Sequence, residues 1–140
     1  TYLDWATRNF ELIGMRAVPL GDRAGINQLL RADCMEFLRE HRRGTHYDLV
    51  IVDPPTFSNS KSTEEDWEVA EGHAALLESL TPLMAPGGTI VFSTNYRRFK
   101  LDEETVARLG LKSIEISKRT VPPEYRNTRI HRCWKMTVGG

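Results

Sequence analysis

An aspartate followed by two prolines, Asp53-Pro54-Pro55, is the most specific chemical signal in the sequence. Proline fixes the backbone and has no N–H, so the neighbouring carbonyls are held in set directions. A carboxylate beside such carbonyls forms a pocket that accepts hydrogen bonds. This pocket suits a flat heterocycle with amine or ring N–H donors, and Phe57 could stack on its ring. The alternative is a rigid turn that only stops a strand.

Other candidate residues follow predicted strands, where open parallel sheets bind their ligands. Asp33 could accept a hydrogen bond from a purine amino group, with the N–H of Cys34 donating to a ring nitrogen. Asp33 could equally cap the helix that follows, and both roles can hold at once. The segment Ser93-Thr94-Asn95-Tyr96 follows another strand. Tyr96 could stack on an extruded base or pack at the sheet edge.

Basic side chains gather towards the end of the chain, although the net charge is zero. Residues 1–95 hold 8 Lys and Arg against 14 Asp and Glu, whereas residues 96–140 hold 11 against 5. Such clusters are usually solvated faces, but beside a site they favour phosphate contacts. The candidates for RNA binding are Lys61, Tyr96, Arg97, Arg98, Lys100 and Arg129, and further basic residues of the last quarter are Lys118, Arg119, Arg126, Arg132 and Lys135.

The spacing of apolar residues predicts helices that alternate with strands. Residues 47–52 are apolar except for Asp48, which predicts a strand buried on both faces, as in a parallel sheet. Alternation of this kind indicates a doubly wound α/β fold in a single domain that covers residues 1–140. We expect helices at 1–13, 33–44, 64–84 and 102–109, and strands at 26–32, 47–52, 89–93, 111–118 and 130–138, the last two as an antiparallel pair.

Composition excludes several classes of protein. The 40% apolar and 27% charged residues are typical of a globular chain, and no apolar run approaches the roughly 20 residues that span a bilayer. No basic segment followed by an apolar one indicates a signal peptide. Cys34 and Cys133 lie far apart and predict neither a disulfide framework nor a zinc site. We therefore expect a cytoplasmic protein with no metal and no membrane contact.

Several segments resemble one family of enzymes. Residues 53–61, Asp-Pro-Pro-Thr-Phe-Ser-Asn-Ser-Lys, resemble the signature of the methyltransferase half of the large-subunit ribosomal RNA guanine methyltransferases K/L. Residues 1–6, 87–93 and 129–134 resemble the same family, so the resemblance extends over the whole chain. It implies a Rossmann-like class I fold, S-adenosylmethionine as cofactor, and N7 methylation of a guanine in 23S rRNA.

The resemblance also implies roles for single residues. Asp33 resembles the acceptor for the adenine amine of the cofactor, and Cys34 would supply a backbone contact. Asp53-Pro54-Pro55 resembles the motif where methyl donor and target base meet. Tyr2 follows the ribose-binding acidic residue of the family; it could stack on the cofactor or simply pack. That acidic residue, and the glycine-rich turn that follows the first strand in the family, would lie upstream of Thr1. We therefore expect a sheet truncated at its N-terminus. Its exposed edge would pair with the missing part of the protein or with a second copy.

The residues alone leave the target nitrogen open. A ring nitrogen such as N7 has a free lone pair and needs alignment, whereas an exocyclic amine needs acceptors such as Asp53. Carbon C5 of cytosine needs a cysteine nucleophile. The residue after Ser93 is Thr94, and we expect neither cysteine at a suitable strand end, which counts against C5 chemistry. The alternatives are a methyltransferase for a small-molecule or protein amine, and an inactive fragment.

Overall fold

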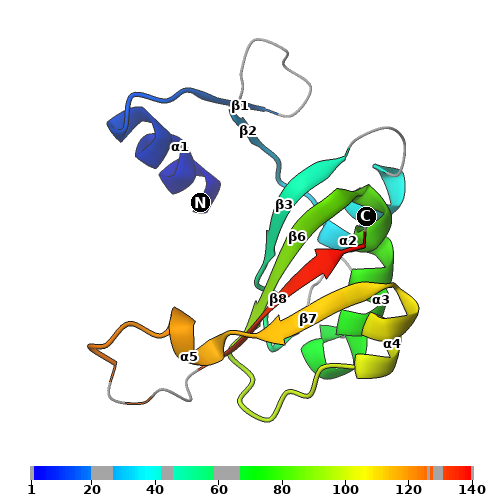
Figure 1. The fold of residues 1–140 in the computed structure, drawn as a ribbon. Coiled ribbons are helices and arrows are strands. Elements are labelled where there is room, and N and C mark those ends of the chain that lie inside the picture. Colours follow the sequence, from blue (N-terminus) through cyan, green and yellow to red (C-terminus); the bar gives the residue numbers. More distant parts are fainter. Residues whose placement is uncertain are drawn as a thin grey trace. The chain divides into compact units, whose positions relative to one another are not determined.

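The computed structural model describes residues 2–19, 27–41, 46–58, 67–125, 127 and 131–139. The chain divides into two compact units, an N-terminal unit of residues 1–37 and a C-terminal unit of residues 38–140. Figure 1 shows the elements of both units. The prediction of a single domain is not tested by this division and stays a prediction.

The N-terminal unit combines one helix with two short parallel strands. Helix α1 (Tyr2–Leu12) precedes strands β1 (Ala17–Pro19) and β2 (Asn27–Leu29), which pair in parallel. The helix ends at Leu12, and Gly14, which the sequence predicts to stop it, follows with a φ of 71°, a left-handed conformation that glycine adopts without strain. The sequence analysis missed β1 and predicted a longer strand at 26–32. Three-residue strands carry too few side chains for a periodic signal.

The C-terminal unit is built on a four-stranded sheet of order β3-β6-β8-β7. Strands β3 (Tyr47–Val52) and β6 (Met84–Thr94) are parallel. Strand β8 (Arg132–Val138) runs antiparallel to both β6 and β7 (Leu111–Glu115), which confirms the predicted closing pair. Helix α2 (Cys34–Glu40) crosses the boundary between the two units.

The core of this unit lies between the sheet and two helices, α3 (Val69–Leu80) and α4 (Glu103–Arg108) (Figure 1). The side chains of Ile90, Phe92 and Met136 are fully buried on the sheet, and Leu77 is fully buried on α3. Asp102 caps α4, since its Oδ1 accepts a hydrogen bond from the N–H of Thr105 at 2.9 Å. The predicted helix at 102–109 is therefore confirmed, with its cap.

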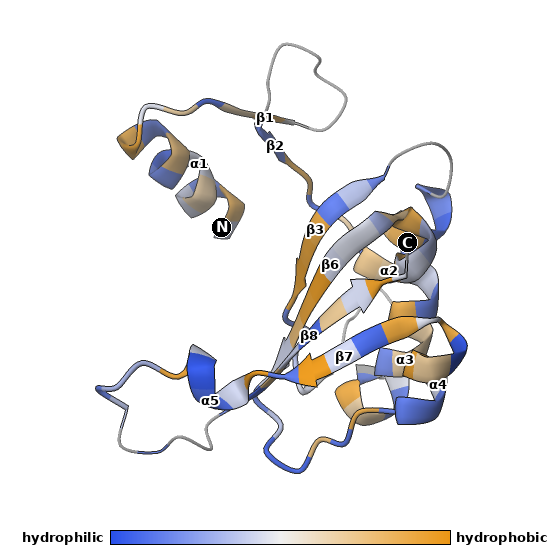
Figure 2. Ribbon diagram, in the orientation of Figure 1, coloured by the Kyte–Doolittle hydropathy of each residue, from blue (hydrophilic) through white to orange (hydrophobic). Residues whose placement is uncertain are grey.

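The expectation that strand 47–52 is buried on both faces is wrong for the C-terminal unit. Leu49 is 58% exposed and Ile51 is 71% exposed, and both lie on the face of β3 opposite α3 and α4. The reason is that β3 is an edge strand of the described sheet and helices cover only one face of the unit. Figure 2 shows the apolar residues along β3. Pairing of this free edge with a second copy stays a prediction.

Other boundaries differ from the predicted ones for local reasons. The described part of the long helix starts at Val69, and residues 67–68 (β5) instead pair with residues 57–58 (β4); residues 59–66 lie outside the described part. The α-helix ends at Leu80 and continues as a 3-10 turn, Thr81–Leu83, that contains Pro82.

The strands also depart from their expected lengths. Strand β6 begins at Met84 instead of Thr89, because Gly87, with φ of 77°, lets the chain continue through a shift of register opposite β3. A side chain at Gly88 would meet the carbonyl oxygen of Ala85 at 2.8 Å. Strand β7 ends at Glu115, since residues 117–120 form a short helix, α5 (Ser117–Thr120).

Candidate active site at the carboxyl edge of the sheet

The carboxyl ends of β3 and β6 lie side by side, and we call this border of the sheet the carboxyl edge. Val52 pairs with Phe92, so Asp53 and Ser93 follow at the same level of the two strands. The hydroxyl of Ser93 donates a hydrogen bond to Asp53 Oδ1 at 2.6 Å. The sequence analysis marked Ser93 only as a residue after a strand, because sequence spacing does not reveal which strands are neighbours.

The two prolines after Asp53 lead into a segment that is tied to α3. Asp53 and Pro55 are exposed, and Pro54 is half-buried. The carbonyl oxygen of Thr56 accepts a hydrogen bond from the N–H of Val69 at 3.0 Å, and Phe57 of β4 pairs with Glu68 of β5. Both ends of this segment are thus fixed to regular structure. Lys61, a candidate for RNA binding, lies outside the described residues.

A turn that carries three cations follows β6, and we call residues 96–100 the basic turn. Arg97, Arg98 and Lys100 are exposed. The turn is closed by a hydrogen bond from the N–H of Phe99 to the carbonyl oxygen of Tyr96 at 3.0 Å. Tyr96 is half-buried, and its N–H donates to the hydroxyl of Thr94. The structure therefore places four of the six candidate RNA-binding residues at the carboxyl edge; Arg129, like Lys61, is outside the described part.

The basic turn is anchored in the core by Phe99, whose side chain is fully buried. Its ring centroid lies 4.7 Å from that of His73, 5.4 Å from that of Phe92 and 5.3 Å from that of Trp134. His73 is buried, and its Nε2 accepts a hydrogen bond from the N–H of Asp102 at 3.0 Å. Its Nδ1 lies 2.9 Å from the carbonyl oxygen of Val69 and donates to it. The ring of His73 therefore links Val69 on α3 to Asp102, and it holds the end of the loop against α3.

Arg132 links three elements at the same edge. Its guanidinium bonds both oxygens of Glu115, with Nε–Oε1 at 3.2 Å and Nη2–Oε2 at 2.9 Å. Nη1 donates to the carbonyl oxygen of Phe99, and the group lies 4.8 Å from the ring centroid of Trp134. The pKa of Glu115 is lowered chiefly by the hydrogen bonds from Arg132 and then by that from Ser117. Each of the three guanidinium nitrogens of Arg132 thus donates a hydrogen bond to a protein oxygen, which the sequence did not reveal.

Cys133 lies at the carboxyl edge, which corrects the expectation that neither cysteine is found there. It pairs with Ser93 because β8 is antiparallel to β6 and begins where β6 ends. Its side chain is buried, and burial raises the pKa of the thiol; the negative charge of Asp53 raises it further, while a hydrogen bond with Thr120 acts in the opposite direction. The protonated thiol is a poor nucleophile, so the chemical conclusion against C5 methylation is unchanged.

The candidate cofactor residues of the N-terminal unit are Tyr2, Asp33 and Cys34. Asp33 caps α2, since its Oδ1 accepts a hydrogen bond from the N–H of Glu36 at 2.9 Å. No described residue bonds its second carboxylate oxygen. Cys34 is an exposed free thiol in the first turn of the helix. Tyr2 is 88% exposed, and its ring meets that of Trp5 edge-on, so it does not pack into the core of its unit.

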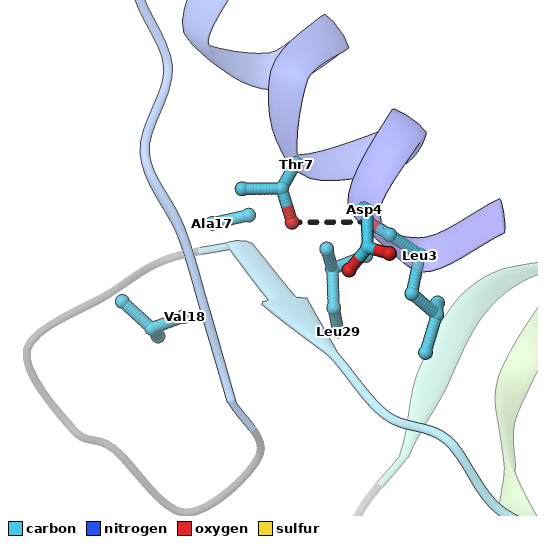
Figure 3. A pocket seen from close by; sticks show the side chains of 6 residues that line it. All are labelled: Leu3, Asp4, Thr7, Ala17, Val18 and Leu29. Carbon is cyan, nitrogen blue, oxygen red and sulfur yellow. Dashed lines mark hydrogen bonds between the residues drawn. The ribbon is translucent and has the colours of Figure 1, made fainter. Parts of the chain in front are cut away.

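The N-terminal unit has a shallow cavity of about 240 Å³ between α1 and the two strands (Figure 3). Its lining is mainly apolar, and the hydroxyl of Thr7 donates to the carbonyl oxygen of Leu3 at 3.0 Å. None of the candidate cofactor residues lines it. The residues that line this cavity are Leu3, Asp4, Thr7, Ala17, Val18 and Leu29.

Within the described residues, no cluster of His, Cys, Asp or Glu could hold a metal ion, and none of the helices has the length and apolar character of a membrane span.

Two curated sequences similar to this chain carry the same description. The ribosomal RNA large subunit methyltransferase K/L of Pseudoalteromonas atlantica is 42% identical over 139 residues, which cover 99% of this chain and 18% of that protein. The protein of the same description from Shewanella amazonensis is 45% identical over 140 residues, with the same shares. The chain thus spans less than a fifth of the length of these relatives. No protein-family model matches the chain.

Solved structures support the fold. SMU.776, crystallised as a complex with SAH, superimposes with a TM-score of 0.62 at 20% identity, covering 94% of this chain and 35% of that one. The SAM-dependent methyltransferase from Agrobacterium tumefaciens gives a TM-score of 0.61 at 21% identity, with 97% and 45% covered. The expected Rossmann-like methyltransferase fold is confirmed by these similarities. With the sequence identities above, the resemblance to the methyltransferase K/L family is confirmed over nearly the whole of this chain.

Proposed function

We propose that this chain is part of the catalytic domain of an enzyme that transfers a methyl group from S-adenosylmethionine to N7 of a guanine in 23S rRNA. The observation that carries the proposal is the carboxyl edge, where an exposed Asp53, oriented by Ser93, lies on the same border of the sheet as the exposed Arg97 and Arg98. The identity with methyltransferases K/L supports both the chemistry and the RNA substrate.

The residues of the N-terminal unit suit the adenine of the cofactor. The second carboxylate oxygen of Asp33, which no described residue bonds, can accept from the adenine amine while Oδ1 caps α2. The N–H of Cys34 lies at the first position of a helix, where no intrahelical acceptor exists, so it is available to a ring nitrogen. Tyr2 presents an exposed ring for stacking. When bound, S-adenosylmethionine supplies an electrophilic methyl group, whose C–S bond breaks as the N–C bond forms, with the electron pair going to sulfur.

The carboxyl edge supplies alignment for the target base. Guanine N7 has a lone pair and no proton to lose, so no general base is required, and Asp53 with the carbonyls of Pro54 and Pro55 would hold the base through its N–H donors. The backbone of Phe57, two residues after Pro55, is held by the β4–β5 pair. The protonated thiol of Cys133 provides no covalent route to a pyrimidine.

The basic turn would bind the RNA around the extruded base. Arg97, Arg98 and Lys100 are exposed cations that can contact phosphates, and Tyr96 can stack on a neighbouring base. Because a base in a duplex must leave its stack to reach the edge, phosphate contacts beside the site would hold the distorted strand. Lys61 and Arg129 are further candidates for these contacts.

The test uses a full-length enzyme that contains this chain. The substitution Asp53→Ala should abolish methylation of 23S rRNA while leaving the fold, measured by the unfolding midpoint, unchanged. Chemical cleavage specific for N7-methylguanosine should map the product. Unchanged turnover of Asp53→Ala would refute the assigned role, and methylation of small amines with none of rRNA would favour the alternative substrate class.

A further inference from the structure

We propose that Ser93 is a positioning residue that acts through Asp53: its hydroxyl holds one carboxylate oxygen so that the other stays directed to the target base. The inference rests on the proposed function, because it concerns the same site. It begins from the short hydrogen bond, 2.6 Å from Ser93 Oγ to Asp53 Oδ1, that joins two residues forty positions apart in the sequence.

Ser93 is well placed to impose a direction on Asp53. It lies within β6 between Phe92 and Thr94, both of which are fully buried, so its backbone is fixed by the core and by pairing on β8. Asp53 has left β3 and is exposed. Within the described part of the chain, Ser93 is the one side chain that hydrogen-bonds it, and the proline that follows restricts its backbone to extended conformations. The fixed serine is therefore the anchor and the aspartate the group that is oriented.

The residue paired with Ser93 competes only weakly with Asp53 for the hydrogen bond that the Ser93 hydroxyl donates. The residue opposite on β8 is Cys133, whose buried thiol is a weak acceptor. A carboxylate can accept several hydrogen bonds, so the bond to Oδ1 leaves Oδ2 open, and no described residue bonds that oxygen. Without the serine, the carboxylate could rotate, and water would replace the hydroxyl as the hydrogen-bond partner of Oδ1. A charge-assisted bond of this kind restricts rotation before the base arrives, which favours the aligned complex.

The experiment compares variants of Ser93 in a full-length enzyme that contains this chain, with steady-state methylation of 23S rRNA as the readout. Ser93→Ala should lower kcat about 10- to 100-fold, the range for losing a hydrogen bond to a charged group. The KM for RNA should stay within about twofold, because the phosphate contacts are untouched. Ser93→Thr, which keeps the hydroxyl, should restore most of the rate.

Ser113→Ala is the matched control, since Ser113 lies on β7 of the same sheet and has no bond to Asp53; it should react at the wild-type rate. Unfolding midpoints of all variants separate loss of fold from loss of alignment. A Ser93→Ala enzyme as active as the wild type, beside an inactive Asp53→Ala enzyme, would overturn the inference and leave the proposed function standing. Failure of Ser93→Thr to restore the rate, in a folded variant, would also overturn it. A fully active Asp53→Ala enzyme would overturn the proposed function itself.

Discussion

Arg132 and the pair Arg97 and Arg98 carry the same charge at the same edge of the sheet, but their surroundings differ. The guanidinium of Arg132 bonds both oxygens of Glu115 and the carbonyl of Phe99. Arg97 and Arg98 are exposed, and no described residue forms a hydrogen bond or an ion pair with their side chains. One cation is therefore part of the fold, and the other two are available to a ligand.

The difference shows that a count of basic residues does not identify a nucleic-acid surface. A guanidinium that already bonds a carboxylate and a carbonyl must lose those bonds before it can contact a phosphate. An exposed cation only loses hydration and releases counterions from the RNA. We therefore expect substitutions of Arg132 to change stability first, and substitutions of Arg97 or Arg98 to change RNA affinity first.

The largest effect on stability should come from Phe99, which belongs to the basic turn and whose carbonyl oxygen accepts a hydrogen bond from Arg132. Phe99→Ala should lower the free energy of unfolding by about 3–5 kcal/mol, because it leaves a cavity among His73, Phe92 and Trp134. Denaturant unfolding of the chain measures this loss. Tyr125→Ala, at a 54% exposed aromatic residue, is the control and should change the value by less than about 0.5 kcal/mol. A small loss for Phe99→Ala would mean that the basic turn is not anchored in the core.

Removing Arg132 should have the next largest effect on stability. Arg132→Met keeps most of the aliphatic stem but removes the donor to the carbonyl of Phe99 and leaves Glu115 with its hydrogen bond from Ser117, which should cost about 1–2 kcal/mol in unfolding experiments. Arg97→Met should cost less than about 0.5 kcal/mol. Equal costs for the two variants would break the distinction between them.

For RNA affinity, we expect the basic turn to matter more than Arg132, the reverse of the order for stability. Arg98→Glu in a full-length enzyme should weaken RNA binding about tenfold at low salt, and the loss should shrink as salt rises, because the lost contact is electrostatic. The affinity for S-adenosylhomocysteine should not change. Lys112→Glu, a charge reversal at an exposed residue near the opposite end of the sheet, should have a much smaller effect. If both reversals weaken RNA binding equally, the basic turn is not the RNA surface.

The smallest effect concerns pH. The pKa of Glu115 is lower in the folded chain than in the unfolded one, chiefly because Arg132 donates to the carboxylate. The stabilisation is therefore present above the unfolded pKa and is lost as pH falls through the folded one. Because the pair is partly exposed, the change should be below about 1 kcal/mol. Stability curves of Glu115→Gln should be flatter between neutral and acid pH; the acid loss that remains includes Asp102, whose pKa is also lowered by hydrogen bonds from Thr105.

Local sequence rules predicted the elements that have strong local signals. Gly14 follows the end of α1, the helix predicted at 102–109 contains α4, and the proline pair after Asp53 marked the end of β3. The same rules failed where a longer-range contact decided the outcome. The strand at 89–93 extends back to Met84 because it pairs with β3, and this pairing has no local signature.

The sequence by itself determined the chemistry available to this protein. Asp53, Pro54 and Pro55 and the cations of the basic turn are recognisable from residue type and spacing, as is the match to the methyltransferases K/L. Only the tertiary structure decided which groups are engaged. Ser93 bonds Asp53, Arg132 is bound by Glu115, and Cys133 lies opposite Ser93, because strand order brings together residues that are distant in the chain. A side chain's type fixes which bonds it can make, whereas its neighbours in space fix which of those bonds remain for a substrate.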